Sequence, residues 1–198
     1  RRLEKLGVNP RNVRDIILTH ADPDHAGGIA DFPAASIHLA SEEFNNLNPH
    51  VPHVPRNPRY LPIQFSHAPR WRPIPPAPAI DWFGLPARPL DLPLNATILL
   101  IPLFGHTNGH CGVAIEHQGR WLLHVGDAYY LRAELSTPDH PVTPLAAARA
   151  DDNAQRIQSL ESLRRLARDH ADLISMIGYH DITQLPAHAI DWPEPASA

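Results

Sequence analysis

The sequence predicts a mixed α/β domain, and three observations carry this prediction. Short apolar segments recur along the chain and end in glycine, histidine or aspartate, which is typical of buried strands that deliver polar side chains at their ends. Residues 145–169 repeat apolar side chains at the spacing of a helix. Prolines gather in residues 45–93, which hold over half of the chain's 23 and therefore exclude a long helix there.

The length, net charge and cysteine content of the chain limit the number of domains and the kinds of partner and metal site. The 198 residues suit one domain, 1–198, and a net charge of -4 with scattered arginines argues against nucleic acid as a partner. Cys111 is the only cysteine, so any metal must use nitrogen and oxygen ligands. No apolar run is long enough for a membrane span, and we expect a cytoplasmic protein with a small-molecule substrate. The chain does not begin with Met, so the presence of an upstream signal peptide is an open question.

The N-terminal quarter is predicted to contain a helix, a strand, a loop and a second strand. Residues 1–6 suit the end of a helix that Gly7 stops, and residues 13–18 suit a buried strand. Gly27 and Gly28 allow a tight turn into a short helix, and residues 36–39 suit the second strand.

The proline-rich segment, residues 45–93, is expected to be an insert within the domain. Its aromatic content indicates that it packs on something, because a disordered segment would carry few aromatic side chains. A lid over the site and a purely structural wrap are both consistent with this composition.

The C-terminal half alternates strands with polar turns. Residues 97–103, 112–116 and 119–125 are predicted strands, and 173–177 is a last one. The helix at 145–169 carries Ile157, Leu160, Leu163 and Leu166 at helical spacing, which predicts a face packed on the core.

One motif points to a metal. His20, Asp22, Asp24 and His25 form the pattern H-x-D-x-D-H directly after the first predicted strand. Imidazole and carboxylate groups are the ligands of divalent cations, and a tight loop can bring several of them onto one or two ions. The motif therefore predicts a metal site at the end of that strand.

Three later segments repeat the design of an apolar strand, a glycine, and then histidine or aspartate. The order is H-x-D-x-D-H, then G-H-T-x-G-H at 105–110, then G-D at 126–127, then H-D at 180–181. This series resembles the metal-binding motifs of the metallo-β-lactamase superfamily, in which the first motif is usually H-x-H-x-D-H. The resemblance implies a four-layer αββα sandwich with a dinuclear site at one edge of its two sheets. That fold normally begins with several strands before the first motif, so the chain is expected to be N-terminally incomplete, with the gap covered either by an upstream segment or by a neighbouring subunit in a homo-oligomer.

The resemblance also implies a ligand set. It makes His20, Asp22 and His106 the ligands of the first metal, and Asp24, His25 and His180 those of the second. Asp127 would bridge both ions, because two neighbouring cations need a shared anion between them.

Asp22 departs from the usual pattern, since the superfamily has histidine there. A carboxylate makes the first site harder and more anionic, which favours manganese or iron beside the zinc that we expect. If Asp22 is not a ligand, the first site is weak or empty.

The implied activity is hydrolysis of an ester, lactone, thioester or amide by a hydroxide held between two metals. Asp24 and Asp127 would hold and orient that hydroxide. Asp127, Ala128, Tyr129 and Tyr130 resemble the D-x-x-Y of N-acyl-homoserine-lactone lactonases, which makes Tyr130 a candidate catalytic residue and a lactone the preferred substrate. A tyrosine packed at a strand end with its hydroxyl in water is the alternative.

Two other functions stay open. An acidic residue in the first motif also occurs in the flavodiiron members of the superfamily, which are iron-dependent oxidoreductases. An inactive truncated fragment is the second alternative. Of the remaining polar residues near these motifs, His38, His110 and His124 are expected to be held by hydrogen bonds within the fold rather than to bind metal.

Overall fold

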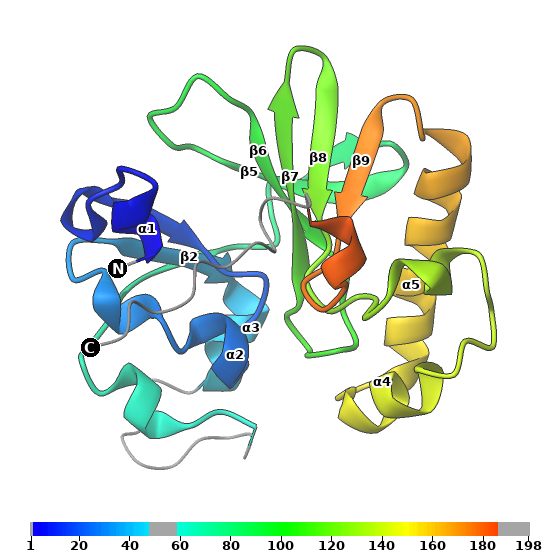
Figure 1. Cartoon of the computed structure of the whole chain (residues 1–198), viewed down its shortest axis with the longest axis horizontal. Helices are drawn as coiled ribbons and strands as arrows, with labels where there is room; N and C mark the ends of the chain where they lie inside the picture. Colours follow the sequence, from blue (N-terminus) through cyan, green and yellow to red (C-terminus); the bar gives the residue numbers. More distant parts are fainter. Residues whose placement is uncertain (1, 48–58, 186–198) are drawn as a thin grey trace, which may run out of the picture.

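The computed structural model describes residues 2–47 and 59–185, and in them two sheets lie face to face (Figure 1). The smaller sheet has three parallel strands in the order β1 (Asp15–Ile17), β2 (Ser36–Ala40) and β3 (Arg70–Ile74). The larger sheet has six strands in chain order: β4 (Ile80–Trp82), β5 (Leu85–Leu90), β6 (Ile98–Pro102), β7 (Cys111–His117), β8 (Arg120–His124) and β9 (Ile174–Ile177).

The directions of the strands in the larger sheet determine which of its loops lie at the same edge. Strands β4 to β8 pair antiparallel, whereas β9 pairs parallel to β8 with His124 opposite Ile177. Strands β6, β8 and β9 therefore run the same way, and their C-terminal ends lie at one edge of the sheet.

The helices are mostly short. They are α1 (Arg2–Lys5), α2 (Pro23–Ala26), α3 (Ser41–Leu47), α4 (Thr143–Arg149) and the long α5 (Asn153–Asp169). Single 3₁₀ turns lie at Pro10–Asn12, Ile29–Asp31, Pro62–Phe65, Arg132–Leu135 and Ile182–Gln184. No described helix has both the length and the apolar character needed to cross a bilayer.

Alternation along β6 shows how the layers pack. Leu99 and Ile101 point to a core shared with α5, whereas Ile98 and Leu100 point to a core shared with Ala40 at the end of β2. Successive side chains of a strand point to opposite faces, so a strand that lies between two layers is expected to bury both sets.

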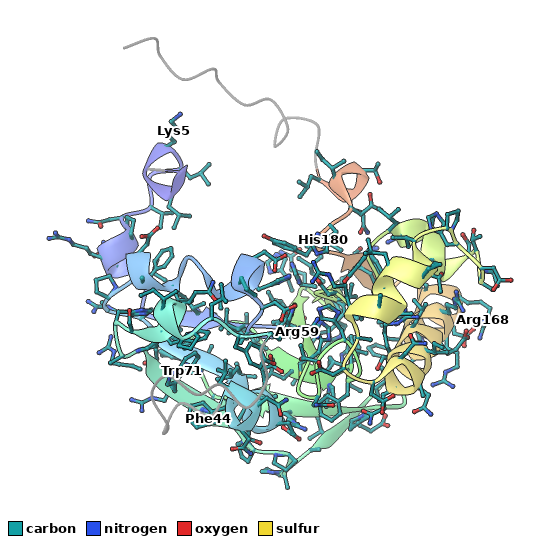
Figure 2. All side chains as sticks on the ribbon, turned by 90° about the horizontal axis from the view of Figure 1, so that it is seen from below. Lys5, Phe44, Arg59, Trp71, Arg168 and His180 are labelled. Carbon is teal, nitrogen blue, oxygen red and sulfur yellow. The ribbon has the colours of Figure 1, made fainter. Side chains whose placement is uncertain are left out.

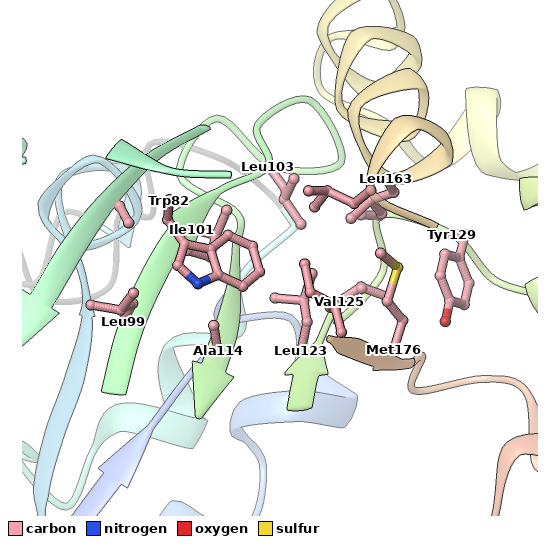
Figure 3. Packing of buried hydrophobic residues seen from close by; sticks show 14 of the residues in the cluster. Trp82, Leu99, Ile101, Leu103, Ala114, Leu123, Val125, Tyr129, Leu163 and Met176 are labelled. Carbon is pink, nitrogen blue, oxygen red and sulfur yellow. The ribbon is translucent and has the colours of Figure 1, made fainter. Parts of the chain in front are cut away.

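The core between the larger sheet and α5 is the most extensive of the three. Figure 3 shows Trp82, Ile101, Leu123 and Met176 from the sheet opposite Leu163 of the helix. A separate core, with Ile37 and Leu39 of β2 among its members, covers the outer face of the smaller sheet. Ala26 of α2 and Leu47 of α3 belong to this core, so the order of layers is helix, sheet, sheet, helix.

The predicted helix at 145–169 is wrong as a single element. The helix ends at Arg149 and begins again at Asn153, where the Asp152 side chain accepts the backbone N–H of Gln155 as an N-cap. Ile157 is also wrong as a core residue, since it is 43% exposed and the preceding Arg156 is buried instead.

The proline-rich segment contributes strands β3, β4 and β5, which the sequence patterns did not predict. Pro86 and Pro89 are tolerated in β5 because residues 85–87 pair only with β4 and residues 88–90 only with β6. Residues 48–58 of this segment lie outside the described residues, and its role as a lid stays a prediction.

Candidate metal centre

The loop after β1 carries four of the predicted ligands. His20 is fully buried, and its Nδ1 lies 3.0 Å from the Thr19 hydroxyl oxygen. Asp22 stands directly before α2, whose Pro23 suits the first helical position. This short helix then presents Asp24 and His25 on successive positions.

The other three predicted ligands follow the three strands that end at one edge of the larger sheet. His106 follows β6, Asp127 follows β8 and His180 follows β9. The two sheets are joined here by a backbone hydrogen bond from the Cys111 N–H to the Thr19 carbonyl oxygen at 2.9 Å. The ligand loops of both sheets therefore meet at this edge.

The structure brings all seven predicted ligands together. Their nitrogen and oxygen atoms form three groups, each with its atoms within 4.8 Å of one another: His20, Asp22 and His106; His20, His25 and Asp127; and Asp24, His25 and His180. Their role as ligands stays a prediction.

Asp127 belongs to one of these groups and also lies beside the histidines of the other two. Its Oδ1 is 3.1 Å from His25 Nε2, and its Oδ2 is 3.1 Å from His180 Nε2 and 3.4 Å from His106 Nε2. Each oxygen of this buried carboxylate faces nitrogens of predicted ligands, which is the arrangement expected of a carboxylate that bridges two cations.

Unpaired buried atoms show that the residues fit a metal. His20 Nε2, His25 Nε2 and Asp127 Oδ1 are buried and make no hydrogen bond of good geometry, although His25 Nε2 and Asp127 Oδ1 lie 3.1 Å apart. Buried polar atoms are almost always paired, and an ion is one of the few partners that several such atoms can share. The donor set of imidazoles and carboxylates suits zinc, manganese or iron.

Burial and pairing set the charges at the site. Burial lowers the pKa of His20 from 6.5 to about 4, so its ring is neutral and able to bind metal at neutral pH. Burial alone would raise the pKa values of Asp22 and Asp127, but the surrounding histidines, together with Arg59 beside Asp22, hold both well below the usual range. The hydrogen bond to Asp127 raises the pKa of His180 despite its partial burial.

Two tyrosines border the centre. Tyr130 is 9% exposed, and its ring centre lies 5.0 Å from that of His180 and 6.0 Å from that of His106. Tyr179 packs its ring against His25 at 4.1 Å and donates its hydroxyl to the Asp24 carbonyl oxygen at 3.0 Å. The predicted candidate Tyr130 thus lies beside ligands of both predicted metals.

The histidines expected to be structural are indeed paired. His110 Nδ1 is 2.9 Å from the Leu103 carbonyl oxygen, and its Nε2 accepts the Asp127 backbone N–H at 3.0 Å. His38 lies 2.8 Å from Asp15 Oδ1, and His124 Nδ1 accepts the Gly126 N–H. His110 therefore holds the backbone of Asp127 in place.

Glu43 and Arg59 also hold the site, and neither was predicted. Glu43 is buried and accepts hydrogen bonds from the Ala21 N–H, the Tyr60 hydroxyl and the Thr107 hydroxyl. Arg59 donates from Nε to Asp22 Oδ1 at 2.5 Å. Glu43 has the sequence context of an ordinary acidic residue in the first turn of a helix, and Arg59 falls in the proline-rich segment without a motif, so no sequence signal marked either.

The sequence matches a family and two curated proteins. The model described as "Metallo-beta-lactamase superfamily" matches residues 1–179. Proteins named "Probable metallo-hydrolase" from Mycobacterium bovis and Mycobacterium tuberculosis are each 41% identical over 136 residues. These matches cover 68% of this chain and 43% of each relative, so the chain spans less than half the length of these relatives.

Solved structures show the same fold. An N-acyl homoserine lactone hydrolase with the product N-hexanoyl-L-homoserine at its catalytic metal centre superposes with a TM-score of 0.64 and 19% identity, covering 92% of this chain and 62% of that one. The dizinc quorum-quenching lactonase AidC gives a TM-score of 0.57 and 20% identity over 91% of this chain and 61% of its own. At this identity the likeness shows the fold alone. Because the family match spans most of the sequence, the chain belongs to the metallo-β-lactamase superfamily.

Proposed function

We propose that this chain carries the catalytic centre of a hydrolase that uses two divalent metal ions, with zinc preferred, to open lactones or related esters, thioesters and amides. The observation that carries the proposal is Asp127, which lies between the two predicted ligand groups with its Oδ1 facing His25 and its Oδ2 facing His106 and His180. The names of the curated relatives as probable metallo-hydrolases support the same reaction class.

The chain's own residues would divide the work. His20, Asp22 and His106 would hold the first ion, and Asp24, His25 and His180 the second, with Asp127 shared. The chemistry that such ions supply when bound is activation of water and polarisation of the scissile carbonyl. Asp24, whose side chain is half exposed, would orient the attacking water and take its proton.

Tyr130 would supply a proton donor. Burial raises the pKa of its hydroxyl to about 12, so it stays protonated at neutral pH. Because its ring lies beside predicted ligands of both ions, we expect the protonated hydroxyl to donate a hydrogen bond to the oxyanion or the leaving oxygen. The lactone preference rests on this tyrosine and on the fold shared with the homoserine lactone hydrolases.

Elemental analysis of the purified protein, followed by a substrate screen, tests the proposal. We expect bound zinc and hydrolysis of one class among N-acyl homoserine lactones, other lactones, thioesters and β-lactams. Protein that takes up no divalent metal, or metal-loaded protein that is inactive on all four classes, would overturn the proposal. Bound iron with consumption of oxygen or nitric oxide would instead support the flavodiiron alternative.

A further inference from the structure

Arg59 lies inside the predicted first metal group. Its Nη2 is 3.2 Å from His106 Nε2, and its Nη1 donates to the His106 carbonyl oxygen and to Asp151 Oδ1, both at 3.0 Å. The side chain is only 14% exposed, and Nη2 also donates to the Arg149 carbonyl oxygen. Figure 2 shows Arg59 and His180 near the centre of the molecule, between the blue N-terminal segments and the yellow helices.

The contact with His106 involves the atom that a metal needs. A guanidinium has only donors, so the 3.2 Å contact is a hydrogen bond in the tautomer in which His106 Nε2 carries no proton and offers its lone pair. In the other tautomer Nε2 donates to Asp22 Oδ2, also at 3.2 Å. A divalent ion bound at Nε2 would use the same lone pair. Arg59 and an ion in the first group therefore compete for His106.

The two carboxylate oxygens of Asp22 face different partners: one bonds Arg59, and the other faces the histidines of the predicted first metal site. Its Oδ1 accepts from Arg59 Nε at 2.5 Å, while its Oδ2 faces His106 and His20 at 3.2 and 3.6 Å. The guanidinium already balances the carboxylate charge, so an ion entering beside it gains less attraction and meets a like charge.

The predicted second metal site, formed by Asp24, His25 and His180, has no such competitor among the described residues. The described ion-pair partners of the Asp24 and His180 side chains are histidines and aspartates of the centre, and no described lysine or arginine pairs with either. The two groups thus share Asp127 but differ in one fixed positive charge.

We propose that Arg59 makes the two metal sites unequal, so that the first ion enters among Asp24, His25, His180 and Asp127, and the Asp22 and His106 site fills only when Arg59 withdraws. This inference rests on the proposed function for the identity of the ligands. Arg59 acts as a positioning residue that sets how many ions the centre holds at a given metal concentration.

Calorimetric titration of metal-free protein with Zn²⁺ tests the inference. The wild type should show two binding events whose dissociation constants differ at least about tenfold. Arg59→Gln should tighten the weaker event about tenfold or more and leave the tighter one within about twofold. Arg72→Gln removes an exposed arginine of β3 and should match the wild type. Asp22→Asn should remove the weaker event alone.

Arg59→Lys covers the case in which the glutamine variant does not fold, which circular dichroism would reveal. A lysine ammonium cannot reach Asp22, His106 and Arg149 together, so the weaker event should still tighten several-fold. Equal affinities in the wild type, or a weaker event that stays unchanged or loosens in the folded Arg59 variants, would overturn the inference. Unequal Zn²⁺ binding that Arg59 controls, without hydrolysis of any screened substrate, would support the inference and refute the proposed function.

Discussion

Thr107 donates its hydroxyl to the Glu43 carboxylate across 2.6 Å, and this bond fastens the His106 loop to the start of α3. The other oxygen of Glu43 accepts the Ala21 N–H at 2.8 Å, inside the first metal motif. One buried carboxylate thus ties together two ligand loops that come from different sheets.

Glu43→Ala should destabilise the protein and weaken metal binding. The change leaves three donors without their acceptor, and leaving buried donors unpaired costs about 3 kcal/mol or more in total. Urea unfolding of metal-free protein measures the loss, and Zn²⁺ titration measures the affinity. Glu161→Ala, at a side chain that is 53% exposed, is the control and should cost less than about 1 kcal/mol. Equal stability of the two variants would contradict the tying role.

Asp127→Asn should reduce bound metal and abolish hydrolysis. The amide keeps the shape but loses the charge that lies between the two ligand groups, so one of the two ions should be lost at micromolar metal. Elemental analysis and turnover are the measurements, with Asp139→Asn as an exposed control. Full metal content and activity in the Asp127 variant would exclude the bridging role.

Gly105→Ala should disrupt the His106 loop by steric contact. The residue has φ +121°, and an added Cβ would lie 2.0 Å from the Arg156 backbone nitrogen. Gly84 also has positive φ, at +79°, but no atom lies within 4 Å of a Cβ added there, so Gly84→Ala isolates the backbone strain. We expect a cost of about 1 kcal/mol at Gly84 and about 3 kcal/mol at Gly105 by urea unfolding. Equal costs at the two positions would show that the loop gives way to the added methyl group.

Tyr130→Phe should lower kcat while metal content stays unchanged. Loss of a single hydrogen bond to the transition state typically costs about a hundredfold to a thousandfold in rate. Tyr129→Phe removes a neighbouring hydroxyl that pairs with Gln184, and it should leave kcat unchanged. If kcat is the same in both variants across good substrates, Tyr130 is a packing residue.

Metal-free protein should lose stability as the pH falls. The pKa of His20 is about 4 in the folded protein against 6.5 when unfolded, so the unfolded chain binds the proton first. The contribution of His20 to the free energy of unfolding is therefore fully present above pH 6.5 and is lost as the pH falls toward 4. We expect this free energy to fall by about 2 kcal/mol between roughly pH 7.5 and roughly pH 5. Urea midpoints across this range provide the measurement, and His20→Gln should flatten the dependence. A dependence that is equally steep in His20→Gln would assign it to other groups.

The family and the general position of the site could be predicted because ligand chemistry follows strand ends. His106, Asp127 and His180 each come a few residues after an apolar segment, and residue type limits what such positions can do. The family prediction is confirmed by the match over residues 1–179. The order of helix, sheet, sheet and helix likewise agrees with the predicted sandwich.

Strand β5 and the break before Asn153 could not be predicted, because both depend on tertiary contacts that leave no local sequence pattern. Strand β5 contains Pro86 and Pro89, which argue against a strand until each half is seen to pair on one side only. The break before Asn153 arises because the N–H groups of Asp151 and Asp152 bond the carbonyl oxygens of His106 and Gly105. Neither contact is visible in the periodicity of the sequence.

The parallel pairing of β9 with β8 has a consequence for how the protein is made. The two strands meet only after α4 and α5 have carried the chain back across the sheet, so this pairing joins segments that are distant in sequence. Distant pairings form late because loop closure must come first. His180 follows β9, so the predicted centre stays incomplete until this pairing forms. A nascent chain on the ribosome would lack His180 until β9 emerges, so metal binding among Asp24, His25 and His180 would report that β9 has paired with β8.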